Sequence, residues 1–474
     1  MALPNTNYGS EQISRMLRDC RAVWMIGIGG VSMCSLAELS LRLGFGVGGS
    51  DRSDGERLEH LRNLGAEIRI GHGENIPARY GAVVYTVAIS DENPEYRAAM
   101  RNGISLISRA DYLGYLMSLY RERIGIAGMH GKSTCTAMCA AVFEATDPTV
   151  LCGAELPAFG DHPCRIGSSR ERFVFEACEY MDSFLHFSPT VAVILNIGLD
   201  HVDYFQNMDQ IRASFLRYAD LVGKDGVVLW NADDAESVRA LELCRAQKKT
   251  FSVRYPDADF YADRIRIEDR RLCFDFYEQG VKTAQISIHA CGKHNAYNAL
   301  AAMGAARICG IPAKSAATAL QNFKGVKRRM EWKGILHGAT VYDDYAHHPD
   351  EIKATLAGAK ELGYDRLLCV YQPHTYSRTA GLFDEFATAF GDADRVLFVD
   401  IYAARERNES GVSSERLANA VQKHGVDAVW SGSVEETAKR LKTEARKGDL
   451  VLVMGAGDIE QLFSMISFDK EKQE

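Results

Sequence analysis

The sequence has no apolar run close to the roughly 20 residues that a helix needs to cross a membrane. The N-terminal stretch MALPNTNYGSEQ also lacks the charged segment and apolar core with which a secretory signal begins. Both absences argue against a membrane-spanning or exported protein. We therefore expect a cytoplasmic location and no membrane partner.

Positive charge is not in excess in this chain. Lys and Arg number 55 against 63 Asp and Glu, which gives a formal net charge of −8, and the pI is near 6.0. Nucleic acids and anionic membranes both favour a basic face. The composition therefore argues against both as partners, whereas small anionic substrates can still be bound by local Lys and Arg side chains.

No C-x-x-C pair occurs among the 12 cysteines. Most of them lie in apolar patterns such as TCTAMCAAV and AARICG. Zinc sites and redox motifs usually need closely paired cysteines. We expect buried free thiols in a reducing compartment rather than disulfides or a metal site.

The 474 residues are too many for one core, and about 150 residues per domain predicts about three domains. Hydrophobic residues at 46% and charged residues at 25% are typical of soluble globular proteins. Short apolar runs alternate with helical patterns, which indicates α/β domains with parallel sheets. We predict domains over 1–122, 123–327 and 328–474, with an antiparallel patch of strands over 259–288.

A glycine-rich turn, MIGIGGVSM, follows the first predicted strand. Gly27 and Gly29 have the spacing of a dinucleotide-binding turn, and Asp51 follows about 20 residues later, although Ser32 replaces the third glycine. We expect the amides of Gly29 and Gly30 to approach a diphosphate at the start of a helix. NAD and a UDP-sugar both fit, so an NAD-dependent dehydrogenase remains an alternative. The first domain is predicted to be Rossmann-like.

A second glycine-rich segment, GMHGKST, lies between the strand RIGIA and the helical pattern CTAMCAAVFEA. This is the context of a phosphate loop, although the standard G-x-x-x-x-G-K-[ST] pattern needs glycine where Ile126 stands. Lys132 can place its charge at the β and γ phosphate oxygens, and Ser133 can bind Mg²⁺. The residues predicted to bind ATP here are Gly128, Met129, His130, Gly131, Lys132, Ser133 and Thr134. The second domain is therefore predicted to be P-loop ATPase-like; a turn with a chance lysine is the simpler alternative.

Acidic residues end two further strands of the same domain. Glu176 and Glu179 lie in FVFEACEYMDSF, and the strand VAVILN leads into Asp200, His201 and Asp203. Parallel sheets place ligands at the carboxyl ends of their strands, and Mg²⁺ prefers oxygen ligands. We expect these side chains to converge on the phosphate loop.

Two asparagines, Asn295 and Asn298, lie three residues apart in the helical pattern KHNAYNALAAM. They can cap that helix or bind the edge of an adenine. Both interpretations remain open. The third domain, with strands VYDDY, LLCVYQ, VLFVD and LVLVMGAG, is predicted to be Rossmann-like.

Nine motifs in order give the chain a family resemblance over nearly its whole length: GIGGVSM, GMHGKST, EACEYMDSF, NIGLDHVDYF, HNAYNALAA, GVKRRME, DDYAHHPDEI, YQPHTYSRT and MGAGDI. The sequence resembles the Mur ligase family, the ATP-dependent amide ligases of peptidoglycan synthesis. It is most similar to the branch that joins L-alanine to the carboxylate of UDP-N-acetylmuramate. Family members use the short loop G-[TS]-x-G-K-[ST]-[ST], so Ile126 is no defect, and Met129 replaces the usual Thr.

The resemblance implies roles in the central domain. Ser133 and Glu176 would hold Mg²⁺ between the β and γ phosphates, and Glu176 with His201 would hold a second ion. Asn295 and Asn298 would lie at the adenine of ATP. Arg329 would also reach ATP.

The resemblance also implies roles in the third domain. Asp344 would lie near the ribose of ATP, and His347 and His348 near the incoming amino acid. Arg378 would bind the alanine carboxylate, because an arginine fork pairs bidentately with it. Thr375 stands where relatives often carry a second basic residue. Taken alone, the two histidines could equally be turn residues before a proline.

The implied reaction activates an acid with ATP. The carboxylate would attack the γ phosphorus, with Lys132 and Mg²⁺ absorbing charge, and the amine would attack the resulting acyl phosphate after losing a proton to His348. Domain closure at hinges near 122 and 327 would keep water out. The expected catalytic residues are Lys132, Glu176, His201, His348 and Arg378. The alternatives are a sister ligase that adds a tripeptide, a dehydrogenase, or a non-catalytic nucleotide switch; we expect a monomer or homodimer.

Overall fold

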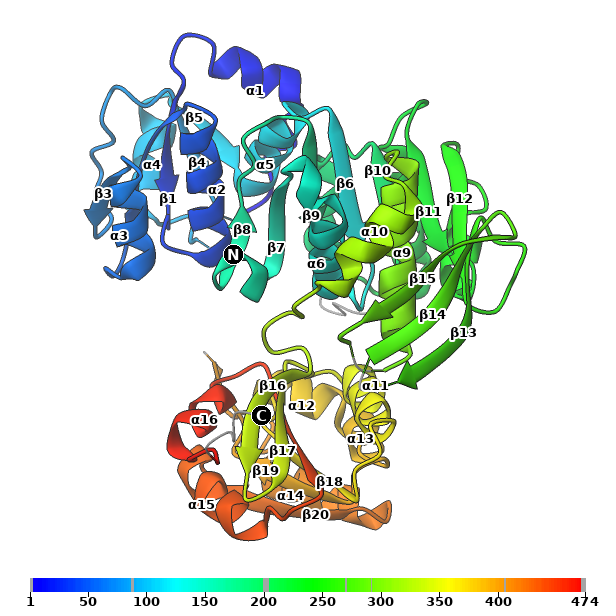
Figure 1. Cartoon of the computed structure of the whole chain (residues 1–474). Coiled ribbons are helices and arrows are strands. Elements are labelled where there is room, and N and C mark those ends of the chain that lie inside the picture. Colours follow the sequence, from blue (N-terminus) through cyan, green and yellow to red (C-terminus); the bar gives the residue numbers. More distant parts are fainter. Residues whose placement is uncertain are drawn as a thin grey trace. The chain divides into compact units, whose positions relative to one another are not determined.

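A computed structural model describes residues 3–86, 89–198, 204–268, 271–290, 292–404 and 406–469. These residues form three sheets surrounded by helices (Figure 1). The chain divides into two compact units, and each is described by itself. The first contains 1–261, 277–283 and 299–319, and the second contains 262–276, 284–298 and 320–474.

The first sheet has five parallel strands in the order β3-β2-β1-β4-β5. The strands are β1 (Ala22–Ile26), β2 (Gly46–Asp51), β3 (Glu67–Ile70), β4 (Ala82–Tyr85) and β5 (Ser105–Ser108). The helices are α1 (Ser10–Met16), α2 (Val31–Arg42), α3 (Glu56–Asn63), α4 (Pro94–Arg101) and α5 (Arg109–Ser118). Successive residues of β1 enter different cores: Val23 and Met25 pack with α2 and α5, whereas Trp24 packs with α4. A sheet covered on both faces is what a run as apolar as AVWMI predicts.

The second sheet has ten strands in the order β15-β14-β13-β12-β11-β10-β6-β9-β7-β8. Its strands are β6 (Glu122–Ala127), β7 (Thr149–Leu156), β8 (His162–Arg165), β9 (Arg172–Glu176), β10 (Val191–Ile194), β11 (Val227–Asn231), β12 (Gln247–Ser252), β13 (Phe260–Glu268), β14 (Arg271–Glu278) and β15 (Val281–Ile288). The strands from β7 and β9 through β6, β10, β11 and β12 to β13 pair in parallel, and β7 pairs with β8 antiparallel. Only two residues join β14 to β15, its neighbour in the sheet, so these two are antiparallel, as predicted. The sequence analysis did not predict β7 and β8.

The helices connected to this sheet include the one that follows the phosphate loop. They are α6 (Lys132–Phe143), η1 (Glu144–Thr146), η2 (Pro157–Phe159), η3 (Tyr180–His186), α7 (Met208–Asp220), α8 (Ala235–Leu241), α9 (His294–Ile308) and α10 (Ala313–Gln321). β6 leads through residues 128–131 into α6, which confirms the predicted order of strand, loop and helix.

The third sheet has six strands in the order β16-β17-β21-β18-β19-β20, all parallel except β16 against β17. The strands are β16 (Glu331–Leu336), β17 (Ala339–Asp344), β18 (Arg366–Tyr371), β19 (Arg395–Val399), β20 (Asp427–Gly432) and β21 (Asp449–Met454). The helices are α11 (Pro349–Lys360), α12 (Tyr376–Gly381), α13 (Phe383–Ala387), α14 (Ser414–Lys423), α15 (Val434–Glu444), η4 (Ile459–Gln461) and α16 (Leu462–Met465). Leu450 and Leu452 of β21 pack on one face and Val451 and Val453 on the other, so helices cover both faces. The predicted α/β fold with parallel sheets is confirmed.

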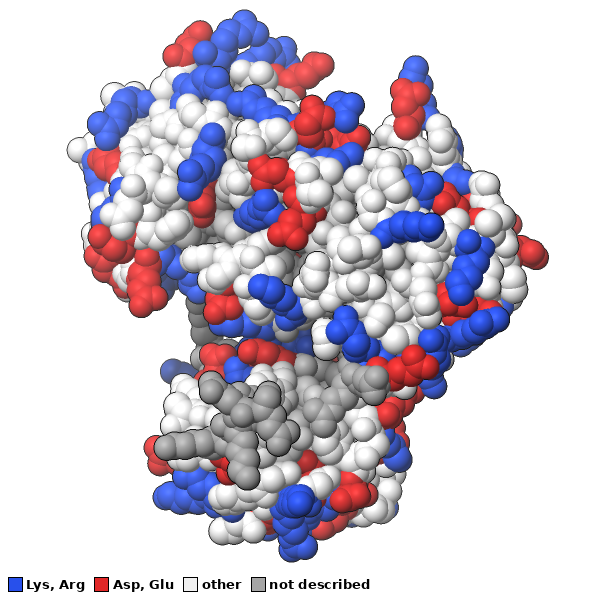
Figure 2. Space-filling view, in the orientation of Figure 1, with Lys and Arg blue, Asp and Glu red and all other residues white. Residues whose placement is uncertain are grey.

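Charged side chains of both signs are interspersed over the face shown in Figure 2, without one dominant basic patch. This distribution agrees with the formal net charge of −8. Within the described ranges, no helix is long and apolar enough to cross a membrane.

Candidate active site

The loop between β6 and α6 has the backbone shape of a phosphate-binding turn. Gly131 has φ +85°, a left-handed conformation that glycine adopts without steric cost, and α6 begins at the next residue. The backbone N–H groups of residues 131–134 have no hydrogen-bond partner anywhere in the described chain. Four consecutive N–H groups at a helix N-terminus suit a phosphate.

Asn196, which follows β10, fixes the other side of this loop. Its Oδ1 accepts from the backbone N–H of His130 at 2.9 Å, and its Nδ2 donates to the carbonyl of the same residue at 3.0 Å. The backbone N–H of Met129 donates to the Asn196 carbonyl at 3.3 Å. Asn196 opens the motif NIGLDHVDYF, and its role in setting the position of the loop is not predictable from that motif alone.

Lys132 is nearly buried and lies back over the loop that precedes it. Its Nζ donates to the carbonyls of Gly128 at 2.5 Å and Met129 at 3.3 Å, and it pairs with Glu179 Oε1 at 3.1 Å. Burial lowers the pKa of Lys132, but the negative charge of Glu179, with smaller contributions from Cys178 and Glu176, raises it above its ordinary value overall. A carboxylate thus holds this ammonium group where the sequence predicts contact with phosphate oxygens.

Glu176, the last residue of β9, is held by strand β7. Its Oε1 accepts from the backbone N–H of Gly153 at 2.6 Å and from the Cys152 thiol at 3.0 Å. A Cβ at position 153 would lie 2.7 Å from Glu176 Oε2, so the carboxylate leaves no room for a side chain there. Neither Cys152 nor Gly153 belongs to a motif that sequence reasoning could have identified.

The predicted magnesium ligands are Ser133, Glu176 and His201. Ser133 is the second residue of α6, and its carbonyl accepts from the same Cys152 thiol at 3.7 Å. His201 lies outside the described residues, as do Asp200 and Asp203. No cluster of three or more His, Cys, Asp or Glu suited to a metal occurs in the part of the chain that the structure describes. A serine hydroxyl beside the loop and a glutamate carboxylate held at the end of β9 are nevertheless oxygen donors of the kind that Mg²⁺ prefers.

The turn after β1 uses its glycine amides internally. The N–H of Gly29 donates to Asp51 Oδ2 at 2.8 Å, and that of Gly30 donates to the carbonyl of Gly27 at 3.1 Å. A diphosphate would have to displace these bonds to reach either amide. Binding of the diphosphate by Gly29, Gly30 and Asp51 therefore stays a prediction, and the structure shows Asp51 as a partner of the turn itself.

Asn295 and Asn298 lie in the first turn of α9, and both are buried. Asn298 Nδ2 donates to Asn295 Oδ1 at 2.9 Å, and Asn295 Nδ2 lies 3.2 Å from His294 Nε2. Because the helix begins at His294, both asparagines are inside it rather than at the capping position. Their contact with adenine stays a prediction.

Asp344, at the end of β17, is buried and organises the connection that precedes β16. Its two oxygens accept from the backbone N–H groups of Met330 and Ala346, each at 2.8 Å. Burial raises the pKa of Asp344, whereas the positive charge of Arg329 opposes the rise. Arg329 lies 3.9 Å from Glu351 and over the ring of Tyr345. The structure gives both predicted ATP residues a local partner, and their contacts with ATP stay predictions.

The two adjacent histidines have different hydrogen-bond partners. His348 caps α11: its Nδ1 accepts from the backbone N–H of Asp350 at 3.3 Å, in a capping box completed by Glu351. His347 Nδ1 lies 3.0 Å from the carbonyl of Tyr345 and must donate to it, since a carbonyl only accepts. In neutral His347 the Nε2 atom therefore carries the lone pair that a base needs. His348 fills the structural role that the sequence left as an alternative.

Arg378 in α12 is half-buried, and its guanidinium has no hydrogen-bond or ion-pair partner among the residues that the structure describes. Burial lowers the pKa of His347, and the positive charge of Arg378 lowers it further, against the opposing effect of Glu351. The pKa of His374 is lowered by burial and by the same arginine. Thr375, which precedes α12, has φ +66°, and its hydroxyl lies 3.5 Å from the Ser377 hydroxyl. An uncompensated cation beside histidines of lowered pKa suits a carboxylate ligand.

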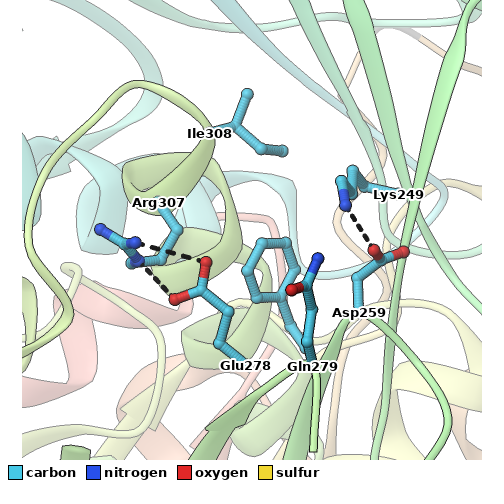
Figure 3. Close-up of a pocket in the computed structure, with 7 residues that line it drawn as sticks. Lys249, Asp259, Glu278, Gln279, Arg307 and Ile308 are labelled. Atoms are coloured by element: carbon cyan, nitrogen blue, oxygen red, sulfur yellow. Dashed lines mark hydrogen bonds and ion pairs between the residues drawn. The ribbon is translucent and has the colours of Figure 1, made fainter. Parts of the chain in front are cut away.

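A small pocket of about 100 Å³ lies elsewhere in the first unit, on strands β12 to β14 and helix α9 (Figure 3). Its charged side chains are paired with one another: Arg307 Nε donates to Glu278 at 2.7 Å, and Lys249 Nζ donates to Asp259 at 2.5 Å. The pocket therefore offers a ligand no unpaired charge, whereas the loop after β6 offers backbone N–H groups that no described residue bonds.

Family models match three consecutive parts of the chain. They are described as the Mur ligase family catalytic domain over 22–121, the Mur ligase middle domain over 126–306, and the Mur ligase glutamate ligase domain over 328–457. The chain belongs to the Mur ligase family. This membership confirms the resemblance drawn from the nine motifs and leaves no support for a dehydrogenase.

The chain is also similar to individual ligases and solved structures of this family. The chain is 41% identical to a UDP-N-acetylmuramate–L-alanine ligase of Clostridium acetobutylicum, covering 94% of this chain and 97% of the relative. The same kind of ligase from Clostridium novyi is 42% identical, with the same coverage. The solved UDP-N-acetylmuramate–alanine ligase of Thermotoga maritima matches with a TM-score of 0.77 and 26% identity over 94% of this chain and 97% of that one. A murein peptide ligase of Psychrobacter arcticus matches with a TM-score of 0.65 and 26% identity, over 93% and 97%.

Proposed function

We propose that this chain joins L-alanine to the carboxylate of UDP-N-acetylmuramate, with conversion of ATP to ADP and phosphate, in cytoplasmic peptidoglycan precursor synthesis. The observation that carries the proposal is identity of about 41% over 94% of the chain with ligases of that name. The phosphate loop supports it, because 131–134 present unbonded amides beside Lys132. ATP, UDP-N-acetylmuramate and L-alanine are the proposed substrates, without a nucleic acid or membrane partner.

The reaction needs an activated acid, because oxide is too poor a leaving group for direct attack by an amine. In the proposed route, a carboxylate oxygen attacks the γ phosphorus of ATP and ADP leaves, which gives an acyl phosphate. The alanine amine then attacks the acyl carbon, and phosphate leaves. Lys132 exchanges Glu179 for phosphate oxygens and reduces the charge on the transferring group.

Magnesium is part of the proposal. Ser133 and Glu176 would hold one ion, and Glu176 with His201 a second; the bound metal neutralises phosphate charge as a Lewis acid. Cys152 and Gly153 keep the Glu176 carboxylate at the end of β9. The loop amides and Asn196 orient the phosphates independently of the metal.

ATP would also be bound by Asn295, Asn298, Arg329 and Asp344, following the family resemblance. On the amino-acid side, Arg378 would pair with the alanine carboxylate. We assign the proton-accepting role to His347 rather than His348, because only the former has its Nδ1–H directed at a carbonyl, which leaves Nε2 as the acceptor. His348 then supports the site by capping α11.

Three further parts of the proposal concern organisation. The domain boundaries near 122 and 327 would serve as hinges for closure, since an acyl phosphate hydrolyses readily in water. Gly29, Gly30 and Asp51 would bind the UDP-sugar after the turn opens. A monomer or homodimer is expected.

The test is release of ADP by the purified chain with Mg²⁺, UDP-N-acetylmuramate and L-alanine. Parallel reactions with a tripeptide in place of alanine address the sister ligase, which the similarity to a murein peptide ligase structure keeps in view. Turnover with the tripeptide but not with alanine would replace the proposal by the sister activity. No ADP release with either acceptor would refute both.

A further inference from the structure

Two arginines stand apart from all the others that the structure describes. Arg109 and Arg378 are half-buried, and neither side chain has a hydrogen-bond or ion-pair partner in the described chain, whereas the remaining described arginines are exposed or bonded. Burying a cation without a counter-ion costs free energy. The family resemblance assigns Arg378 to a substrate carboxylate, and nothing yet accounts for Arg109.

The surroundings of Arg109 explain why it has no internal partner. It is the first residue of α5, directly after β5. The carboxylate nearest along its helix, Asp111, is already used: it accepts from the Ser108 hydroxyl at 3.0 Å and from Thr6, and it pairs with His186 Nδ1 at 2.6 Å. Asp111 thus has several partners of its own, and none of them is Arg109.

Helix α5 packs against η3, the segment that follows Glu176 and Glu179. A Cβ at Gly114 of α5 would lie 2.1 Å from the carbonyl of His186, so the two backbones are in direct contact. The His186–Asp111 ion pair fixes the same contact. This packing places α5, with Arg109 at its start, against the segment that follows Glu176 and Glu179.

The electrostatics agree with that placement. Lys132 is neutralised by Glu179 at 3.1 Å. Desolvation lowers the pKa of Arg109, with only the Cys178 thiol acting against it. Of the two cations near Cys178, one has a resident carboxylate and the other has none.

We infer that Arg109 binds the carboxylate of the acid substrate and holds it beside the phosphate loop, as the counterpart of Arg378 for the amino acid. The inference rests on the proposed function and adds a residue to it. A guanidinium fork suits a carboxylate, because two parallel N–H groups match its two oxygens. The diphosphate of the sugar nucleotide is the other oxyanion of that substrate. We favour the carboxylate, because β4 separates β5 from β1, whose turn is the predicted diphosphate site.

Calorimetric titration of the full chain without ATP tests this inference. We expect Arg109→Gln to weaken binding of UDP-N-acetylmuramate by about 10- to 100-fold, the usual effect of losing a charged hydrogen-bonded pair. The affinity of Arg109→Lys should lie between those of the wild type and Arg109→Gln, because lysine keeps the charge and loses the fork of N–H groups. Arg101→Gln is the matched control: this exposed helical arginine of the same sheet region pairs only with Glu74, and its loss should leave binding unchanged.

A second ligand tests whether Arg109 binds the carboxylate or the diphosphate of the sugar nucleotide. UDP-N-acetylglucosamine carries the same diphosphate without the lactyl carboxylate, so its binding, measured by competition, should be equal in wild type and Arg109→Gln. Equal weakening of both sugar nucleotides would overturn the carboxylate assignment in favour of the diphosphate. Unchanged binding of both would overturn the site altogether.

Thermal unfolding distinguishes substrate binding from a structural role. Because no described residue pairs with Arg109, Arg109→Gln should leave the unfolding midpoint of the ligand-free chain unchanged or higher; a clear fall would show that the arginine serves folding instead. ADP release by the wild type is measured in parallel. If it fails, the proposed function is wrong, whereas normal release with full binding by the variant refutes only the role of Arg109.

Discussion

The phosphate loop of the first unit and the amino-acid site of the second treat charge in opposite ways. Lys132 is paired with Glu179, and its pKa is raised, whereas Arg378 has no partner among the described residues and the pKa values of His347 and His374 are lowered. In the proposed function, the first site exchanges a resident anion for its ligand. The second requires the ligand to bring the counter-charge, which also favours neutral histidines before the amino acid arrives.

The largest effect should follow from removing the paired cation. We expect Lys132→Ala to reduce ADP release by at least about 1000-fold, since charge on the transferring phosphoryl group loses its compensation. Circular dichroism should show an intact fold. A loss below about tenfold would show that the exchange of Glu179 for phosphate is not part of the reaction.

The adjacent histidines provide a matched pair for the second site. His347→Gln should lower kcat by about 100-fold or more, as for loss of a general base. His348→Gln should keep kcat within about tenfold and instead lower stability by about 1 kcal/mol through the weakened cap. Because the pKa of His347 is lowered, the wild-type rate should fall with decreasing pH only below the ordinary histidine value of about 6.5. The reverse ranking of the two variants would return the base role to His348.

Replacing the Glu179 carboxylate by a neutral amide should have a smaller effect, on the affinity for ATP. Glu179→Gln removes the main group that raises the pKa of Lys132, so that pKa should fall, and ATP should no longer compete with a carboxylate. We expect the apparent affinity for ATP to rise by at least about threefold, since even an exposed ion pair is worth up to about 1 kcal/mol and this one is nearly buried. Fluorescence titration with a labelled nucleotide measures it; weaker binding would mean that Glu179 itself supports the nucleotide.

The smallest effect concerns Asp343 in the second unit, whose carboxylate is 3.4 Å from Arg328. Burial raises its pKa to about 7, although Arg328 and Lys333 oppose the rise. An unfolded aspartate titrates near 3.9, so the folded state binds the proton more tightly and this group loses stabilisation as pH rises through about 7. The wild type should therefore lose about 1 kcal/mol of unfolding free energy between pH 6 and pH 8, and Asp343→Asn should not. Urea unfolding at both pH values measures the difference. An equal pH dependence in variant and wild type would contradict the raised pKa.

Sequence patterns were sufficient for the fold class and for the loop after β6. Long apolar runs such as AVWMI and LVLVM identify strands covered on both faces, and GMHGKST after a strand identifies the loop. β7 and β8 were missed because TVLCGAEL contains a glycine and HPCR is short. β7 is a strand through its pairing with β9, and β8 through its pairing with β7. Boundaries near 122 and 327 remain predictions.

Single residues of the site were harder to predict. Arg109 belongs to no motif, and its proposed role rests on its having no partner among the described residues, which depends on how Asp111 is used. Likewise, the sequence DDYAHHP does not distinguish the roles of its two adjacent histidines. Their difference comes from the partner of Nδ1, which is a carbonyl for His347 and a backbone N–H for His348.

The Lys132–Glu179 pair also affects which anions bind to the ligand-free protein. Free orthophosphate and other stray anions meet a lysine that is already neutralised, and each must win against a carboxylate tethered at its side. A nucleoside triphosphate has the further advantage of the four amides at 131–134, which a lone small ion engages less completely. The pair thus favours the binding of polyvalent ligands over that of abundant small anions.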